Sequence, residues 1–141
     1  MKILLQALQN ATPGNTVLVP KYSNYYIFSV YVVGLKQVQL RVEGKLIAIS
    51  NITAWPVMDG DYQSVLYFPN CSNFTLTGPG TIDGQGYRWW VELLFNFLQH
   101  NRPRLIHFQN CVDVLVENLT LLNAPQFHIY AKPIKNFIVR T

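Results

Sequence analysis

Short runs of alternating apolar and polar residues, separated by Gly, Asn and Pro, recur along most of the chain. Residues 65–83 and 105–123 match in this pattern at a constant offset, so that Phe68 corresponds to Phe108. A third copy follows at a shorter offset, with Ile129 in the place of Ile106, and a fainter copy lies earlier, at 35–47. Repeats of roughly 20–50 residues are typical of solenoid proteins.

One such unit cannot bury its own apolar face, whereas stacked units bury a continuous core. We therefore predict an all-β fold, specifically a parallel β-helix, with residues 1–141 as one domain. A β-sandwich would need hairpin turns between long alternating strands, and the Asn-Gly or Asp-Gly pairs that form them are scarce. Asp83-Gly84 is the one candidate.

Two segments have helical periodicity instead. Residues 2–11 carry an apolar stripe that stops at Pro13, and we predict a cap helix there; the stripe consists of Ile3, Leu4, Ala7 and Leu8. Residues 87–99 lie between the two repeats that are separated by the longer offset. Their apolar pattern predicts an inserted helix that ends before Pro103. Its expected apolar face consists of Trp90, Leu93, Leu94, Phe97 and Leu98.

Composition and charge narrow the range of partners. Half of the residues are apolar and 13% are charged, which argues against disorder. The net charge of +4 comes from scattered basic residues, so we predict no nucleic-acid partner. A solvated surface explains the excess of Lys and Arg over Asp and Glu more simply than a binding site for a polyanion. No window is long enough to cross a membrane, and Gln6 and Gln9 interrupt the only stretch that resembles a signal peptide.

Five N-x-S/T sequons are a hint of a secretory route, although so short a motif also arises by chance; they start at Asn10, Asn51, Asn70, Asn73 and Asn118.

Cys71 and Cys111 occupy equivalent repeat positions, which places them about 4.8 Å apart in adjacent coils. That distance permits a disulfide, but parallel side-chain directions fit one poorly, and we predict a buried stacked pair.

The stretch "GTIDGQGYRWW" at 80–90 combines an acid, glycines and aromatic residues. Asp83 as a catalytic acid would need a second carboxylate, and its repeat equivalent is the amide Asn123, so turn formation is the better interpretation. We expect Gly84 and Gly86 to turn the chain out of the coil. Trp89 and Trp90 are expected to pack over Tyr87 and the coil, since adjacent helical residues cannot stack on one face of a ligand.

The remaining acids and histidines form no recognisable catalytic set. Asp59 and Asp61 offer oxygen ligands for calcium, but two acids around a glycine are more often a turn, and we predict no metal and no cofactor. His107 and His128 alternate with apolar neighbours and are expected on the outer surface, and His100 is expected at the end of the inserted helix.

Three motifs in order carry a resemblance to a known family: G-T-I-D-G-Q-G at 80–86, R-P-R at 102–104, and N-L-T-L-x-N-x-P-x-F-H-I at 118–129. Together they resemble glycoside hydrolase family 28, the polygalacturonases, over nearly the whole chain. The resemblance implies a right-handed parallel β-helix, inverting hydrolysis of pectin (α-1,4-galacturonan) in carbohydrate metabolism, and secretion to the cell exterior.

Four motifs of that family are absent from this sequence: N-T-D, D-D, G-H-G and R-I-K. In the family the first of them follows the strand that "IKNFIVRT" resembles, and the sequence stops at Thr141. We therefore expect an N-terminal portion without the catalytic coils, monomeric, inactive alone and prone to aggregate at its last strand.

A second hypothesis is a non-catalytic β-helix that binds acidic polysaccharide; a pectate or pectin lyase on the same fold agrees less well with the motifs. We assign no catalytic residue in this sequence. The candidate substrate-binding residues are Arg102, Arg104, His128 and Lys132.

Overall fold

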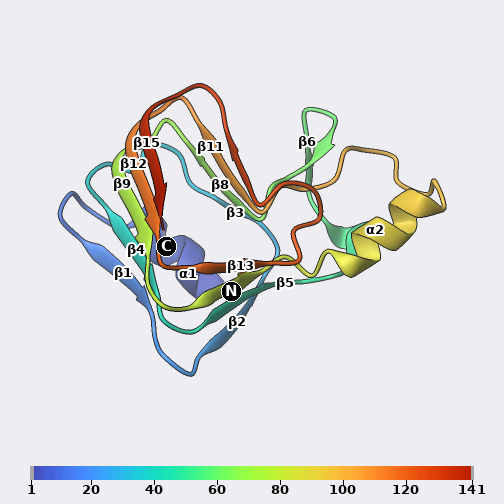
Figure 1. Ribbon diagram of the computed structural model, residues 1–141, viewed down its shortest axis with the longest axis horizontal. Coiled ribbons are helices and arrows are strands. Elements are labelled where there is room, and N and C mark those ends of the chain that lie inside the picture. Colours follow the sequence, from blue (N-terminus) through green and yellow to red (C-terminus); the bar gives the residue numbers. More distant parts are fainter. Residues whose placement is uncertain (1, 141) are drawn as a thin grey trace.

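The computed structural model describes residues 2–140, which wind into a parallel β-helix with three sheets around one core (Figure 1). Sheet A contains β1 (Thr16–Val19), β4 (Gln39–Val42), β9 (Ser72–Thr77), β12 (Cys111–Glu117) and β15 (Ile134–Arg140). Sheet B contains β2 (Asn24–Ile27), β5 (Lys45–Ala48), β10 (Thr81–Asp83) and β13 (Thr120–Leu122). Sheet C contains β3 (Val30–Tyr31), β8 (Leu66–Pro69), β11 (Ile106–Gln109) and β14 (Ile129–Ala131).

The residue offsets between sequence repeats equal the offsets between residues that pair across neighbouring strands. Phe68 pairs with Phe108 across β8 and β11, which is the longer offset. Ile106 pairs with Ile129 across β11 and β14, which is the shorter offset. The predicted all-β parallel β-helix is therefore confirmed.

Aromatic rings from successive coils form the centre of the core. Phe68 and Phe74 have ring centroids 5.0 Å apart, and Phe108 lies 5.9 Å from the first and 6.2 Å from the second. All three side chains are fully buried. Stacking of equivalent positions explains why each coil repeats the same apolar pattern, since an apolar residue meets an apolar residue above and below it.

The sharp turns between sheets use Asn and Asp in the left-handed region of backbone space. The same conformation bends the backbone near the starts of β9, β12 and β15, where Asn73, Asp113 and Asn136 have φ angles of 51°, 59° and 57°. The Asn136 side-chain amide donates a 2.8 Å hydrogen bond to Asp113. Asn and Asp tolerate this conformation better than other residues with a side chain, which explains their recurrence at this position.

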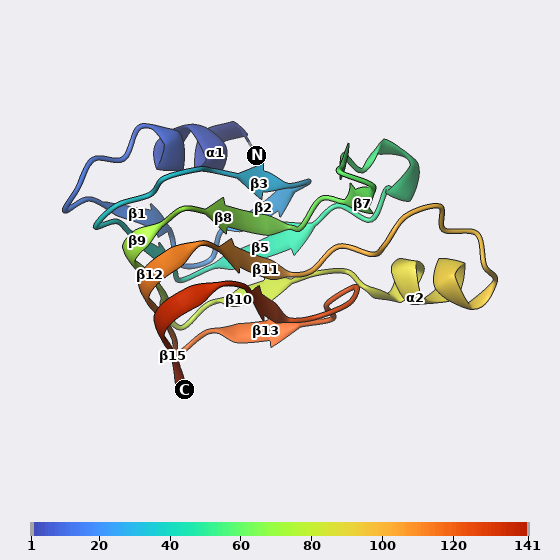
Figure 2. The ribbon, with the colours of Figure 1, turned by 90° about the horizontal axis from the view of Figure 1, so that it is seen from above.

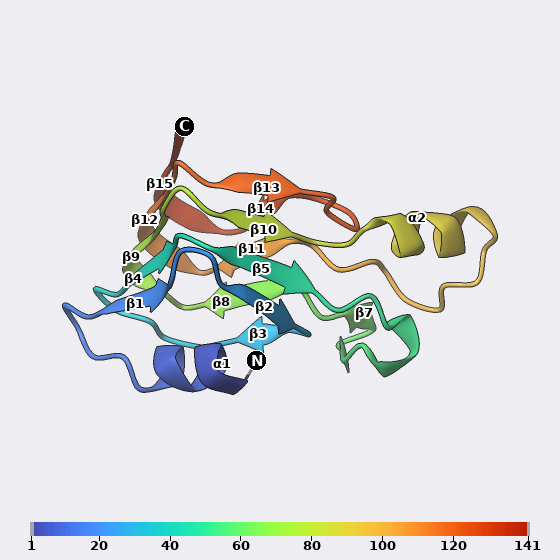
Figure 3. The ribbon, with the colours of Figure 1, turned by 90° about the horizontal axis from the view of Figure 1, so that it is seen from below.

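The first helix, α1 (Lys2–Gln9), lies over one end of the coil stack (Figures 2 and 3). Leu4 and Leu8 are buried and close the top of the core, whereas Ile3, expected on the same stripe, is 68% exposed. At the opposite end β13, β14 and β15 are each the last strand of their sheet. That end leaves apolar side chains such as Val139 half exposed.

The second helix, α2 (Tyr87–Leu94), projects sideways from the coil (Figure 2) and is shorter than the predicted 87–99. Asn96 has a φ of 61°, which breaks the helix. Most of the expected apolar face does not pack, since Leu94 and Phe97 are 79% and 70% exposed, whereas Leu98 packs against the core. Trp89 is buried instead, with its ring centroid 5.8 Å from Trp55 and 4.8 Å from Tyr62.

A short antiparallel hairpin that the sequence pattern did not reveal joins β5 to β8. It consists of the 3-10 turn η1 (Ile52–Ala54) followed by β6 (Val57–Met58) and β7 (Asp61–Tyr62). Its turn residues Asp59 and Gly60 have φ angles of 54° and 83°. The Asp-Gly hairpin therefore lies here and not at Asp83-Gly84, where the chain leaves β10 for α2.

Candidate functional site

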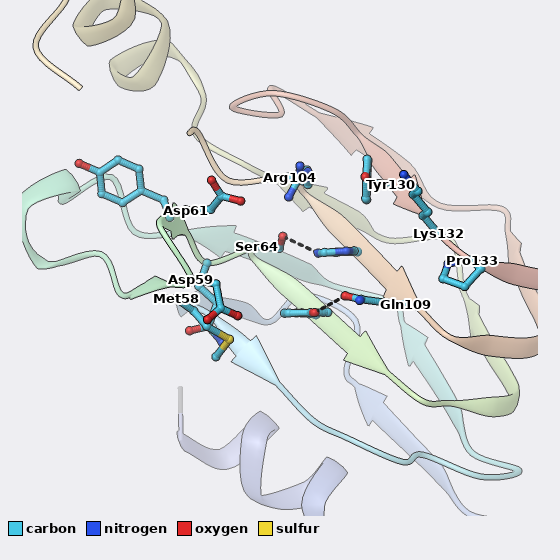
Figure 4. A pocket seen from close by; sticks show the side chains of 13 residues that line it. Met58, Asp59, Asp61, Ser64, Arg104, Gln109, Tyr130, Lys132 and Pro133 are labelled. Carbon is cyan, nitrogen blue, oxygen red and sulfur yellow. Dashed lines mark hydrogen bonds between the residues drawn. The ribbon is translucent and has the colours of Figure 1, made fainter. Parts of the chain in front are cut away.

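A cavity of about 410 Å³ lies on the outer face of sheet C, beside the β6–β7 hairpin (Figure 4). One wall comes from the hairpin and the segment after it, and the other from β8, β11, β14 and the residues that flank them. The lining residues are Met58, Asp59, Asp61, Tyr62, Gln63, Ser64, Tyr67, Arg104, His107, Gln109, Tyr130, Lys132 and Pro133.

The sheet C wall is a column of rings, one from each coil. Tyr31, Tyr67, His107 and Tyr130 are register partners in β3, β8, β11 and β14. Tyr67 and His107 stack with centroids 4.2 Å apart and planes 3° from parallel, and Tyr130 meets His107 edge-on at 5.0 Å. Stacking covers one face each of Tyr67 and His107, so these two rings offer mainly their edges and polar atoms to the cavity.

His107 is a buried member of this column, with 8% of its surface exposed. Its Nδ1 lies 3.2 Å from the Ser64 hydroxyl. Burial, helped by the positive charge of Arg104 and opposed by Asp61, lowers the His107 pKa to about 4. The side chain points out of the coil as predicted, but the expected surface histidine is wrong because the stack and the hairpin cover it.

Tyr67 and Gln109 form the other polar contact of the wall. The Tyr67 hydroxyl donates a 2.6 Å hydrogen bond to the Gln109 side-chain oxygen. Burial, with a smaller effect from the neighbouring Tyr31, raises the Tyr67 pKa above its ordinary value. The phenol is therefore neutral at physiological pH and serves as a hydrogen-bonding group.

Arg104 places a cation in the cavity. Its guanidinium lies 4.2 Å from the Tyr130 ring centroid, in cation–π geometry. Its Nε is buried without a hydrogen-bond partner, and none of the ion pairs formed within residues 2–140 includes Arg104. An arginine held by an aromatic ring, with no carboxylate of its own in this part of the chain, is an available anchor for an anionic group.

The other candidate binding residues divide between the cavity and its surroundings. Lys132 lines the same cavity as Arg104, with Tyr130 between the two in Figure 4. Arg102 donates a 2.7 Å hydrogen bond to the Pro125 carbonyl and does not line it. His128 is exposed and also lies outside the lining.

The two carboxylates of the cavity both come from the hairpin. Asp61 accepts a 2.7 Å hydrogen bond from the Asn101 side chain, and Asp59 occupies the hairpin turn. Among the residues that the structure describes, no carboxylate comes from the opposite wall, so the cavity lacks an acid and a base that face each other across a substrate. Within residues 2–140, no three His, Cys, Asp or Glu side chains gather as a metal cluster.

The residues of the "GTIDGQGYRWW" stretch make structural contacts outside the cavity. Asp83 accepts hydrogen bonds from the Gln85 backbone at 2.9 Å and from the Asn123 side chain at 3.3 Å. A Cβ on Gly84 or Gly86 would approach the Asn123 carbonyl to 2.7 or 2.5 Å. Trp90 donates a 3.1 Å hydrogen bond to the Ala124 carbonyl. Tyr87, expected beneath the tryptophans, is 74% exposed and does not support them.

Sequence reasoning missed the ring column, although the repeat contained a signal for it. Tyr67, His107 and Tyr130 are separated by the same two offsets as the core positions beside them. An outward position that keeps aromatic character over three coils indicates a built surface. The β6–β7 hairpin, which turns this surface into a cavity, has no counterpart in the repeat and so could not be recognised from the repeat offsets.

Similar proteins agree with this architecture. The chain is 31% identical to a probable polygalacturonase from Vitis vinifera over 115 residues, which cover 72% of the chain and 23% of that protein. It is 28% identical to polygalacturonase-2 from Solanum lycopersicum over 138 residues, 94% of the chain and 29% of that protein. The chain thus spans about a quarter of the length of these curated relatives.

Solved structures share the fold. The polygalacturonase from Erwinia carotovora ssp. carotovora superposes with a TM-score of 0.82 at 22% identity, covering 98% of this chain and 43% of that one. An exopolygalacturonase from Thermotoga maritima superposes with a TM-score of 0.74 at 19% identity, covering 99% and 41%. Both likenesses support the right-handed β-helix.

The model of the glycosyl hydrolases family 28 matches residues 11–141. This match covers nearly the whole chain, and the β-helix is the fold of the solved polygalacturonases above. The chain therefore belongs to glycosyl hydrolase family 28.

Proposed function

We propose that the sheet C cavity is part of the pectin-binding cleft of a polygalacturonase-type hydrolase, and that Arg104 binds a galacturonate carboxylate there. The observation that supports this most directly is the arginine itself, which lies on the Tyr130 ring with a buried Nε and no ion-pair partner within residues 2–140. Guanidinium groups bind carboxylates with paired, charge-assisted hydrogen bonds.

The rest of the cavity fits a hydroxyl-rich acidic sugar. Lys132 adds a second cation to the cavity, while Ser64 and Gln109 bring hydrogen-bonding groups. Asp59 and Asp61 on the hairpin wall would repel a carboxylate but accept hydrogen bonds from sugar hydroxyls. In our proposal a galacturonate unit therefore points its carboxylate toward sheet C and its hydroxyls toward the hairpin.

We further propose that this chain alone binds the polysaccharide without cleaving it. Inverting glycosidases need two carboxyl groups about 6.5–9.5 Å apart on opposite sides of the scissile bond. The sequence lacks the N-T-D and D-D motifs of the family, and the two cavity carboxylates share one wall. Release of reducing ends from polygalacturonate by the purified chain would overturn this part of the proposal.

Binding is tested by titrating the chain with galacturonan oligosaccharides in a calorimeter. Arg104→Gln should weaken the affinity at least tenfold, while Arg88→Gln, an equal charge change on α2 outside the cavity, should leave it within about twofold. Fully methyl-esterified oligosaccharides should bind the wild type as weakly as the variant, since their carboxylates are masked. Equal affinity of the two variants would reject Arg104 as the anchor.

The lack of facing carboxylates in the described cavity also favours a second candidate, a pectin-binding β-helix that has no catalytic role. The two candidates differ in the gene: N-T-D and D-D motifs encoded in frame with these residues support an enzyme, and their absence supports a binding module. In either case we propose an extracellular location, where pectin is found. No helix within residues 2–140 is long and apolar enough to cross a membrane.

A further inference from the structure

Two sulfur atoms meet inside the coil stack, and neither cysteine lines the candidate cleft. Cys71 joins β8 to β9, and Cys111 is the equivalent residue of the next coil. Their Sγ atoms lie 2.6 Å apart, and the two residues are only 1% and 2% exposed. The structure holds them as free thiols, which agrees with the buried stacked pair expected from the repeat.

The contacts around the two thiols are unequal. The Cys111 sulfur accepts hydrogen bonds from the Cys71 thiol and from the Cys71 backbone N–H, the latter at 3.2 Å. In return the Cys111 thiol lies 3.1 Å from the Phe68 carbonyl. Donation from Cys71 lowers the Cys111 pKa to about 7, while the pKa of Cys71 is raised. Cys111 is therefore the better nucleophile of the pair.

We propose that Cys71 and Cys111 are a disulfide site that covalently joins two successive coils. The strand register fixes the two backbones side by side, about 4.8 Å apart in parallel sheets, which is inside the range that disulfides span. Backbone hydrogen bonds hold both segments on either side of the cysteines. The parallel side-chain directions expected from the repeat do not keep the sulfurs apart, since the two Sγ atoms lie 2.6 Å from each other.

The oxidant is a small-molecule or protein disulfide, such as glutathione disulfide. The Cys111 thiolate attacks one oxidant sulfur and releases the first thiolate; the Cys71 thiolate then attacks the Cys111 sulfur of the mixed disulfide and releases the second. Two protein thiols and one oxidant disulfide thus give one protein disulfide and two oxidant thiols. Because the pair is buried, the oxidant reaches Cys111 when the coils open locally or close during folding.

The new bond would close a loop between residues 71 and 111, which contains α2 and one full coil. Cross-linking restricts the unfolded chain more than the folded one, so the oxidised protein should melt about 5–10 °C higher than the reduced protein. The bond would hold the turn between sheets C and A, on the side of the stack away from α2 (Figure 1).

The test measures the thiol–disulfide equilibrium of the wild-type chain with glutathione, once in native buffer and once in concentrated urea. Free thiols are trapped with iodoacetamide and counted by mass spectrometry. We expect the protein disulfide to be favoured at least 100-fold more in the native protein, which corresponds to about 2.7 kcal/mol. Peptide mapping should show one disulfide-linked pair of peptides that contain Cys71 and Cys111.

Three outcomes would overturn the proposal: an equal or smaller equilibrium constant in native buffer, two free thiols after oxidative refolding, or glutathione retained on Cys111. The double variant C71S/C111S provides the control for the melting experiment, because reductant should lower the melting temperature of the oxidised wild type and leave this variant unchanged. If the double variant does not fold, the thiol–disulfide equilibrium of the wild type still tests the proposal.

Discussion

Tyr67 and His107 stack face to face although they are distant in the chain, with ring centroids 4.2 Å apart and planes within 3° of parallel. The two residues hold the same position in successive coils of sheet C. The wall of the candidate cleft is therefore assembled by the same register that assembles the core. Its stability and its surface chemistry are linked through His107.

His107 should make the protein less stable in mild acid. Its pKa is about 4 in the folded protein and ordinarily 6.5, so between these values the unfolded chain binds a proton that the folded chain does not. The free energy of unfolding should thus fall as the pH is lowered from about 6.5 to 4, by up to about 3 kcal/mol, and level off below. Urea denaturation at half-unit pH steps measures this.

The matched control is His107→Tyr, which places at this position the residue found in the coils on both sides. Carboxylates elsewhere titrate in both proteins, so the difference between the two pH profiles isolates the imidazole. Parallel profiles between pH 4 and 6.5 would show that His107 gains its proton equally in the folded and unfolded states.

Trp89→Ala should destabilise the protein by about 3–5 kcal/mol, the usual cost of removing a large buried aromatic ring. Trp89 is 1% exposed and is the contact through which α2 packs on Trp55 and Tyr62. Trp90→Phe is the control, since Trp90 is 41% exposed and would lose one hydrogen bond, worth about 1 kcal/mol. A similar effect of both changes on the urea midpoint would contradict the buried role.

Gly86→Ala should be more damaging than Gly14→Ala. A Cβ on Gly86 would approach the carbonyl oxygens of Asn123 and Ala124 to 2.5 and 2.8 Å, so the turn itself would have to move. Gly14 has a φ of 92° but open space around it, and an alanine there costs about 1 kcal/mol of backbone strain. Thermal melting of the two variants checks the order; the reverse order would mean that the turn at Gly86 yields easily.

The last coil should make the chain associate at high concentration. Val139 pairs with the buried Val116 one coil earlier, yet it is 54% exposed because no strand within residues 2–140 covers it. Val139→Lys should reduce association, since a lysine at an open edge opposes strand pairing. Light scattering at several concentrations measures this. The control is Leu94→Lys on α2, because the Leu94 side chain is 79% exposed. If Leu94→Lys reduces association and Val139→Lys does not, the α2 surface causes the association.

The regular part of the fold could be predicted because each coil repeats the same pattern of buried apolar residues. The two repeat offsets set the register of Phe68, Phe108 and Ile129, and a wrong register would have turned apolar residues outward. The turn residues could be read for the same reason, since Asn73, Asp113 and Asn136 share an unusual backbone conformation.

The irregular excursions could not be predicted in the same way. The apolar residues from Trp90 to Leu98 suggest a long packed helix, yet the helix ends at Leu94 and Asn96 takes a positive φ. Of the basic residues that the acidic-polysaccharide hypothesis names, Arg104 and Lys132 line the cavity, whereas the placement of Arg102 depends on one contact with the Pro125 carbonyl. Such contacts form between loops and leave no periodic trace.

Both excursions that interrupt the coils, the β6–β7 hairpin and the α2 segment, leave the coil after a sheet B strand and return before a sheet C strand. The following coil, from β11 to β14, has no such excursion and is correspondingly shorter. Length can therefore be added or removed at this one corner while every wall residue keeps its neighbours. Insertions and deletions at this corner can thus reshape the rim of the sheet C cavity while the strand register of the coils stays the same.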